Sequence, residues 1–337
     1  MSDELWRPGP RSGRHAVACV GETMVSFIPF GGAALDTAAR MEIDIAGAES
    51  NVAMYLADHG IDARWISRLG DDAFGRRVRD RVRACGVDVS GVRTDPARPT
   101  GLLFKDPGKA DGGGTTVTYR RAGSAASAMG PEALDHEAAR TASVWHLTGI
   151  TPALSEDCYA LVESALRAGG GADRPAVSFD VNFRPAVWRG HRSAPADLLR
   201  RLAQAADIVF VGLDEAQALW GARSAHAQDV RSLLPEPRIL VVKDGASAAT
   251  AFFGRSSVVV PALRVDVVEP VGAGDAFAAG FLAALLRGRS AEQCLRSGHL
   301  TAAAALSVTG DHGPLPPSDV FTELLDVPSE AWPLCRV

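Results

Sequence analysis

The chain has 337 residues, which is enough to bury a substantial core in one large α/β domain. Its 47% hydrophobic and 22% charged residues are typical of an ordinary soluble globular protein. The formal net charge of −5 gives no support to binding of nucleic acids or anionic membranes, so local cations would have to hold an anionic ligand.

The ends of the chain and its cysteines indicate where the protein works. Residues 1–14 are polar, lack the apolar segment of a secretory signal and are predicted to be a flexible leader; residues 15–325 are predicted to form the main domain and residues 326–337 a C-terminal tail. The five cysteines form no CxxC or Cys/His cluster, which favours a reducing compartment over a zinc site or a disulfide framework. The longest apolar run, residues 276–286, is too short to span a bilayer. We therefore expect a cytoplasmic protein.

The first half of the chain is predicted to contain mixed short elements. Strands are expected at 15–20 and 63–67, short strands and loops over 24–45, and helices at 48–59 and 74–85. Two strand-like runs, 101–105 and 115–120, flank the glycine-rich stretch 112–114 and predict a hairpin. The early strands and this hairpin are predicted to form a small separate β-layer.

The second half predicts a regular alternation of strands and helices. Strands are expected at 144–147, 177–180, 208–211 and 239–243, helices at 156–168, 214–220, 275–287 and 291–308, and a hairpin at 250–253 and 257–260. This alternation indicates an α/β fold with a mostly parallel central sheet and helices on both faces.

The strongest local motif is PVGAGDAF at residues 270–277, between a β-like run at 265–268 and a strongly apolar helix. Two glycines allow a tight turn, and the helix N-terminus that follows supplies unpaired N–H groups and a partial positive charge, which together make a phosphate site. Asp275 could accept a proton from a hydroxyl that attacks a γ-phosphate. A glycine turn with an aspartate N-cap is the structural alternative. The motif is neither a Walker A loop nor a GxGxxG fingerprint.

Two segments carry a family resemblance. EPVGAGDAFAAGF at 269–281 resembles the C-terminal signature of the ribokinase-like (PfkB-type) carbohydrate kinases, and AGAESNVA at 46–53, followed by Gly60 and Gly70, resembles the N-terminal signature. The resemblance covers roughly residues 16–320. It implies a ribokinase-like fold with a discontinuous β-lid from about 22–45 and 98–122, and pairing of this lid in a homodimer, because its exposed edges invite association.

Five segments look like 2-keto-3-deoxygluconate kinases in particular. They are GAESN at 47–51, YRRAGSAAS at 119–127, HLTGITP at 146–152, DVNFRP at 180–185 and GDHG at 310–313. Glu49 departs from the general signature, where many members carry a small residue, but suits this subgroup. The resemblance implies ATP-dependent phosphorylation of a sugar acid at a terminal hydroxyl, with ATP and Mg²⁺ as cofactors; whether a monovalent cation is also needed stays open.

The resemblance also assigns roles to individual residues. Asp275 would be the catalytic base, with charge on the phosphoryl group stabilised by the N–H groups of Gly272, Ala273 and Gly274. Substrate contacts would come from Gly47, Asn51, Leu103, Tyr119, Arg120 and Arg184, and ATP contacts from Asn182, Arg184, Lys243, Gly245, Ala246, Gly272 and Gly274. Glu215 would help to organise Mg²⁺ through water, although Gly212 stands where the family usually has Asn or Ser.

Other readings stay open at this stage. A kinase of the same family could act on fructose, ribose or a nucleoside; two arginines in the site, Arg120 and Arg184, would favour an acid, because a guanidinium binds a carboxylate with two parallel hydrogen bonds. A non-catalytic sugar or nucleotide sensor is opposed by Asp275, and an NAD-dependent oxidoreductase by the lack of an early GxGxxG. The gluconate- and galactonate-derived epimers are not distinguished.

Overall fold

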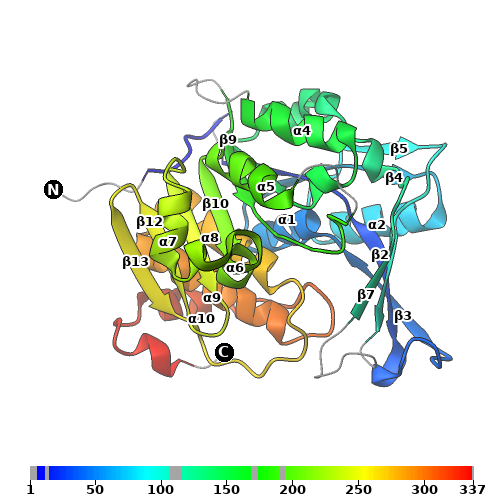
Figure 1. Cartoon of the computed structure of the whole chain (residues 1–337). Helices are drawn as coiled ribbons and strands as arrows, with labels where there is room; N and C mark the ends of the chain where they lie inside the picture. Colours follow the sequence, from blue (N-terminus) through cyan, green and yellow to red (C-terminus); the bar gives the residue numbers. More distant parts are fainter. Residues whose placement is uncertain (1–5, 12–14, 107–115, 168–173, 190–193, 336–337) are drawn as a thin grey trace.

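A nine-stranded sheet forms the centre of the molecule, as a computed structural model of the chain describes it for residues 6–11, 15–106, 116–167, 174–189 and 194–335 (Figure 1). Its strand order is β13-β12-β11-β10-β9-β8-β1-β4-β5. The strands are β1 (Ala16–Val20), β4 (Asp62–Gly70), β5 (Val92–Asp95), β8 (Val144–Thr148), β9 (Ala176–Asp180), β10 (Ile208–Gly212), β11 (Ile239–Asp244), β12 (Ala248–Phe253) and β13 (Ser256–Pro261). The seven strands from β11 to β5 in this order run parallel, and β12 and β13 join antiparallel at the other edge. The predicted mostly parallel sheet is confirmed.

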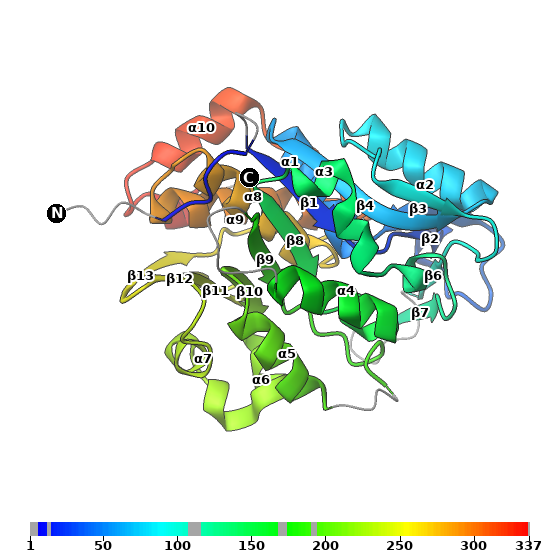
Figure 2. The same ribbon diagram turned by 90° about the horizontal axis from the view of Figure 1, so that it is seen from above.

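Helices cover both faces of this sheet (Figure 2). One face carries α1 (Ala48–Asp58), α2 (Ala73–Ala84), α8 (Ala273–Leu286), α9 (Ala291–Leu306) and α10 (Ser318–Asp326). The other carries α3 (Glu137–Arg140), α4 (Glu156–Arg167), α5 (Pro195–Gln204), α6 (Leu213–Trp220) and α7 (Ala227–Leu233). Because both faces are covered, central strands such as β10 are buried along their whole length and read as continuous apolar runs. In the described part of the chain, no helix combines the length and apolar character needed to cross a membrane.

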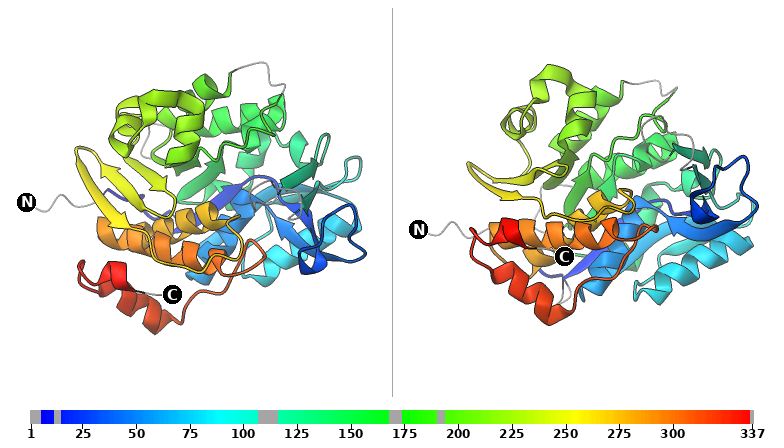
Figure 3. Two further views of the ribbon diagram at one scale, coloured as in Figure 1. Left: turned by 60° about the horizontal axis from the view of Figure 1, so that its bottom comes forward. Right: turned by 90° about the horizontal axis from the view of Figure 1, so that it is seen from below.

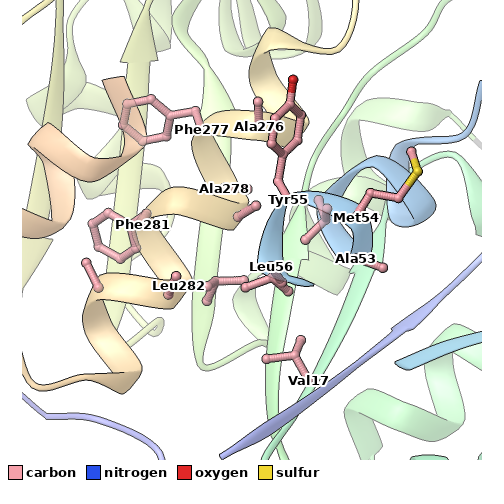
Figure 4. Packing of buried hydrophobic residues seen from close by; sticks show 14 of the residues in the cluster. Val17, Ala53, Met54, Tyr55, Leu56, Ala276, Phe277, Ala278, Phe281 and Leu282 are labelled. Carbon is pink, nitrogen blue, oxygen red and sulfur yellow. The ribbon is translucent and has the colours of Figure 1, made fainter. Parts of the chain in front are cut away.

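Helices α1 and α8 pack directly against each other. Tyr55 and Leu56 of α1 face Ala278 and Leu282 of α8, and all four side chains are fully buried (Figure 4). Alanines along α8 allow the helices to approach closely, and close packing resists relative movement of the two helices. The first turns of both helices are thereby held next to each other.

A small second sheet stands at one end of the molecule (Figures 1 and 3). Its order is β3 (Met41–Ala46), β2 (Met24–Pro29), β6 (Leu102–Asp106) and β7 (Thr116–Arg120). Strands β2 and β6 pair in parallel and the other neighbours antiparallel. The predicted separate β-layer is therefore confirmed, while the predicted turn at 112–114 lies outside the described residues.

Three features differ from the expectations. The β-like run at 265–268 is not a strand: Val267 and Val268 are 58% and 56% exposed, and the Val268 N–H bonds to the end of α9 instead of to a strand. The chain ends extend the folded unit beyond residues 15 and 325, because Trp6 packs against the core and Trp332 is 1% exposed within it. The indole N–H of Trp332 donates to the carbonyl of Pro261 at 2.8 Å, so part of the predicted tail is integral to the domain.

Candidate active site

A pocket opens between the small sheet and the first turns of α1 and α8. The small sheet contributes side chains that alternate along its strands, and the large domain contributes residues from loops and helix starts. The lining includes Met24, Ala46, Leu103, Lys105, Val117 and Tyr119 from the small sheet and Gly47, Asn51, Asn182, Arg184, Gly272, Asp275 and Asp311 from the large domain. The structure thus brings most of the predicted substrate residues together.

Asp275 lies in the first turn of α8 and lines this pocket. Its carboxylate accepts hydrogen bonds from the side-chain amides of Asn51, at 2.9 Å, and Asn182, at 3.1 Å. Burial raises the pKa of Asp275 to about 7; the Asn51 hydrogen bond opposes this rise and the charge of Asp180 adds to it. The carboxylate can therefore both accept and release a proton near neutral pH.

The turn before Asp275 requires glycine at Gly272. Gly272 has φ +86°, a left-handed conformation, and a Cβ there would lie 2.9 Å from the carbonyl oxygen of Asp311. A Cβ at Gly274 would lie 3.3 Å from the ammonium of Lys243. The start of α8, where the first N–H groups have no partner within the helix, therefore faces Lys243 with nothing bulky between them.

The other residues that are predicted to contact the nucleotide lie at the ends of β9 and β11. Lys243 donates to the Asp180 carboxylate at 2.8 Å, and the backbone N–H of Asn182 donates to the same group at 3.1 Å. Asn182 has φ +40°, and its buried Oδ1 has no hydrogen-bond partner among the described residues. Gly245 and Ala246 lie in the exposed turn that follows β11, next to Lys243. An unpaired buried acceptor and an ammonium beside a helix start suit a polyphosphate and its counterion.

Glu215 and Arg184 form an ion pair at the edge of this region. One guanidinium N–H donates to Glu215 Oε1 at 2.9 Å, and the backbone N–H of Gly212 donates to Oε2 at 3.1 Å. Burial raises the pKa of Glu215, and the charge of Asp180 adds to the rise. Gly212 therefore contacts Glu215 through its backbone alone. Within the described ranges, no group of three or more His, Cys, Asp or Glu could hold a metal ion by itself.

Arg120 is the one predicted substrate residue that the structure turns away from the pocket. It is exposed on β7, and its guanidinium donates to the carbonyl of Tyr119. Successive side chains of a strand point to opposite faces, so Tyr119 faces the pocket and Arg120 does not. Arg121, just past the strand, takes its place in the pocket lining. The structure therefore contradicts the placement of Arg120 in the pocket and places Arg121 in the lining instead.

Arg121 is held by a buried carboxylate that sequence reasoning missed. Its Nε donates to Glu22 at 2.6 Å, and the hydroxyl of Ser124 donates to the other oxygen of Glu22, also at 2.6 Å. Glu22 is 3% exposed. The guanidinium lies 5.5 Å from the ring centre of Tyr119, so the two side chains present one surface to the pocket.

A second ion pair that sequence reasoning missed joins the small sheet to the large domain. Lys105 donates to Asp311 at 3.0 Å, with both side chains nearly inaccessible, and Asn51 approaches the other oxygen of Asp311 at 3.4 Å. Two sequence signals could have indicated these residues: Lys105 lies two positions beyond Leu103 and so on the same face of β6, and Asp311 lies within the GDHG segment.

The start of α1 forms the floor of the pocket. A Cβ at Gly47 would lie 2.5 Å from the carbonyl oxygen of Glu22, so only glycine fits. Glu49 is buried and accepts hydrogen bonds from Thr148, at 2.8 Å, and Thr151, at 2.7 Å. Burial raises the pKa of Glu49, and these hydrogen bonds oppose the rise. Two threonines of the HLTGITP segment therefore hold the Glu49 carboxyl group in place.

Curated proteins resemble the chain along nearly its full length. A model of the pfkB family carbohydrate kinases matches residues 14–317. The chain is 33% identical to a 2-dehydro-3-deoxygluconokinase of Thermoproteus tenax over 94% of this chain and 96% of the relative. It is 32% identical to a 2-dehydro-3-deoxygalactonokinase of Haloferax volcanii, over 89% and 93%, and 31% identical to fructokinase-1 of Zea mays, over 84% and 86%.

Solved structures share the fold. A PfkB protein from Polaromonas sp. JS666 superposes with a TM-score of 0.76 at 32% identity and covers 87% of this chain and 96% of its own. A protein of E. coli described as a putative ribokinase II in complex with ATP and Mg²⁺ superposes with a TM-score of 0.78 at 21% identity, over 92% and 98%. The second likeness supports the fold alone.

Proposed function

Because the chain belongs to the pfkB family of carbohydrate kinases, we propose that it transfers the γ-phosphoryl group of ATP to a sugar acid, 2-keto-3-deoxygluconate, with Asp275 as the general base. The observation that carries this proposal is the buried carboxylate of Asp275, which lines the same pocket as Lys105 and Arg121. The same pocket therefore offers a base for a hydroxyl and cations for an acid.

Asp275 is suited to take a proton from the attacking hydroxyl. A general base works best when its pKa lies near the working pH, and burial moves the pKa of this carboxyl to about 7. Asn51 and Asn182 each donate to one of its oxygens, which fixes the orientation of the carboxylate toward the pocket. The hydroxyl to be phosphorylated, the 6-hydroxyl of 2-keto-3-deoxygluconate, would lie between Asp275 and the phosphate.

The groups around the glycine turn would hold the phosphates of ATP. The N–H groups at the start of α8 offset charge on the transferring phosphoryl group, and Lys243 supplies a cation on the facing side. Bound Mg²⁺ would neutralise further phosphate charge. Glu215 and the unpaired Oδ1 of Asn182 would meet it or its water shell, which fits the preference of this ion for oxygen ligands.

The cations in the lining of the pocket support an acid as substrate. Arg121 uses Nε and one terminal nitrogen on Glu22, and a guanidinium has five N–H donors, so donors remain for a carboxylate. Lys105 and Arg184 are also in the lining, and Arg184 keeps 46% of its side chain exposed. Each of these cations is already paired with a carboxylate. Because such pairs can also serve the structure alone, another sugar kinase of the family, such as a fructokinase, is the second candidate.

The test is an ADP-release assay with Mg·ATP that compares 2-keto-3-deoxygluconate with its galactonate epimer, fructose, ribose and adenosine. We expect kcat/KM to favour a keto acid by about a hundredfold, roughly 2.7 kcal/mol of transition-state discrimination. A preference for fructose or ribose would refute the sugar-acid proposal and leave the kinase assignment intact. No turnover with any of them would refute the proposed substrate set.

The small sheet, which we call the lid, is also the proposed surface of a homodimer. Phe30 and Ile43 belong to this part of the chain and are 49% and 41% exposed, and the small sheet has two free edges in the described chain. Pairing of two lids would cover these side chains. Sedimentation at micromolar concentration should give a dimer, and a monomer alone would refute this arrangement.

A further inference from the structure

A second pocket lies at the amino ends of the central parallel strands. Its lining includes residues that directly precede or begin these strands: Ser143 before β8, Ala176 in β9, Asp207 before β10 and Arg238 before β11. The catalytic pocket takes residues such as Asn182 from the opposite edge of the sheet, beyond the end of β9. Because β9 has five residues and a strand rises about 3.3 Å per residue, roughly 17 Å separate the two edges. In the described part of the chain, no residue lines both pockets.

The N-terminal segment 6–11 forms one wall of this pocket and is docked on the edge of the sheet. The backbone N–H of Arg11 donates to the hydroxyl of Ser143 at 3.3 Å, Pro8 is buried, and Trp6 packs against the hydrophobic core. Every residue of the segment lines the pocket. The cavity has a volume of about 340 Å³, which is within the range of sites that bind small molecules.

The lining holds more guanidinium groups than carboxylates. Asp207 supplies the only carboxylate among the described lining residues, and two arginines share it: a terminal nitrogen of Arg174 lies 3.0 Å and Nε of Arg238 lies 3.7 Å from its oxygens. Arg11 has no carboxylate partner among the described residues. Arg7 is not counted, because its guanidinium lies against the turn that follows α8. Three guanidinium groups and one carboxylate leave an excess of two positive charges in a chain whose net charge is −5.

Two of these guanidinium groups keep donors for a ligand. Arg174 uses two of its nitrogens, one on Asp207 and one on the carbonyl of Pro175 at 2.9 Å, and a guanidinium has five N–H donors. The guanidinium of Arg238 lies over the ring of Trp6, 5.0 Å from its centre. Stacking on a ring holds the plane of a guanidinium and leaves the N–H groups at its edge available to the oxygens of a phosphate.

We propose that this pocket binds a compact phosphate compound with about two negative charges. A phosphate monoester carries about −1.5 to −2 charge at neutral pH, which matches the excess of positive charge, whereas a single carboxylate would neutralise only half of it. The three phosphate-binding groups come from separate parts of the chain: Arg11 from the N-terminal segment, Arg174 before β9 and Arg238 before β11. The site does not depend on the proposed function, and its test needs no assay of turnover.

Isothermal titration calorimetry of the full-length protein, without Mg²⁺ or ATP, tests the binding. The ligands are inorganic phosphate, pyrophosphate and glucose 6-phosphate, which distinguish a free ion from an ester, and gluconate, which is an anion without phosphate. We expect at least one phosphate compound to bind with a dissociation constant of about 1 mM or below, and gluconate to bind at least tenfold more weakly. Failure of all three phosphate compounds to bind at millimolar concentration, or equal binding of gluconate, would overturn the proposal.

Variants locate the site, because phosphates can also bind in the catalytic region. Arg11→Met combined with Arg238→Met should weaken the binding by about tenfold or more, since hydrogen bonds to a charged group are lost, whereas Lys243→Met should leave this binding event intact. Arg223→Met, which removes an exposed arginine outside both pockets, is the matched control and should bind as wild type. Thermal unfolding without ligand checks the fold of each variant. Binding that Lys243→Met abolishes and the double variant keeps would overturn the proposal.

The indole of Trp6 offers a second test that leaves every arginine in place. Because Arg238 lies over this ring, a phosphate bound to Arg238 should change the tryptophan fluorescence of the wild-type protein. Trp6→Phe keeps an aromatic ring under the guanidinium, so it should still bind the phosphate compound in calorimetry but lose the change in fluorescence. The same change in Trp6→Phe as in the wild type would place the ligand elsewhere and overturn the assignment.

Discussion

The two walls of the pocket are built on different structural principles. On the large-domain wall, Asp275 and Asn51 stand near helix starts and Asn182 follows the end of a strand, so each position follows from a short turn. On the lid wall, Tyr119 and Lys105 lie on strands, where alternation alone decides which side chain faces the pocket. A one-residue change of register would replace the polar groups of the lid and leave those of the large domain untouched.

The two walls also differ in the charged groups that they hold. The large-domain wall holds a carboxyl whose pKa lies near 7, so its charge can change during a reaction. The lid wall holds Arg121 and Lys105, each in an ion pair with a buried carboxylate. This difference suggests that the large domain carries the chemistry and the lid carries the choice of substrate, and substitutions on each wall can test the division.

Replacing Asp275 by Asn should have the largest effect. The variant keeps the shape of the side chain but removes the base, so we expect kcat to fall by about two to four orders of magnitude. The KM for the sugar should change much less, because the lid is unaltered. Steady-state kinetics with both substrates measures this, and circular dichroism should show an unchanged fold. Near-normal turnover would remove Asp275 from the role of base.

On the lid, Arg121→Met should raise the KM for a sugar acid by about 10- to 100-fold, because hydrogen bonds to charged groups contribute about 1.5–3 kcal/mol. The matched control is Arg120→Met, which removes the same charge from the opposite face of β7 and should leave KM unchanged. A double variant, Arg121→Met with Glu22→Gln, distinguishes two causes of a raised KM. In the single variant Glu22 is left as an unpaired carboxylate, whereas in the double variant only the contact of Arg121 with the substrate is lost. If Arg120→Met were the more damaging change, the orientation of β7 would be wrong.

Arg120 and Arg121 also show the limit of what the sequence alone could predict. Strand and helix alternation predicted the large sheet, and the glycine turn predicted Asp275 at a phosphate site, because both depend on neighbours in the chain. The register of β7, which decides between Arg120 and Arg121, depends on pairing with β6 and on which face is buried. The partner of Lys105 lies 206 residues away, and no local pattern encodes such a contact.

The pH dependence should report the large-domain wall alone. Asp275 must be ionised to accept a proton, and its pKa is raised to about 7, chiefly by burial. We therefore expect kcat/KM to fall about tenfold for each pH unit below 7 and to level off above it. Arg121→Met should keep this profile at a lower height, because the substitution leaves Asp275 and its hydrogen bonds to Asn51 and Asn182 in place. A profile that is flat between pH 5 and 8 in the wild type would contradict the assignment.

The smallest effect should come from Tyr119→Phe, which asks what the lid ring contributes. The ring lies in the pocket lining, with the guanidinium of Arg121 5.5 Å from its centre, and this contact does not need the hydroxyl. If the hydroxyl makes one hydrogen bond to the sugar, its loss should raise KM by roughly two- to tenfold, with kcat unchanged. Tyr119→Leu, which also removes the ring, should cost more, because Arg121 then loses its neighbour. Equal effects of the two variants would mean that the hydroxyl alone matters, and that the ring does not position the arginine.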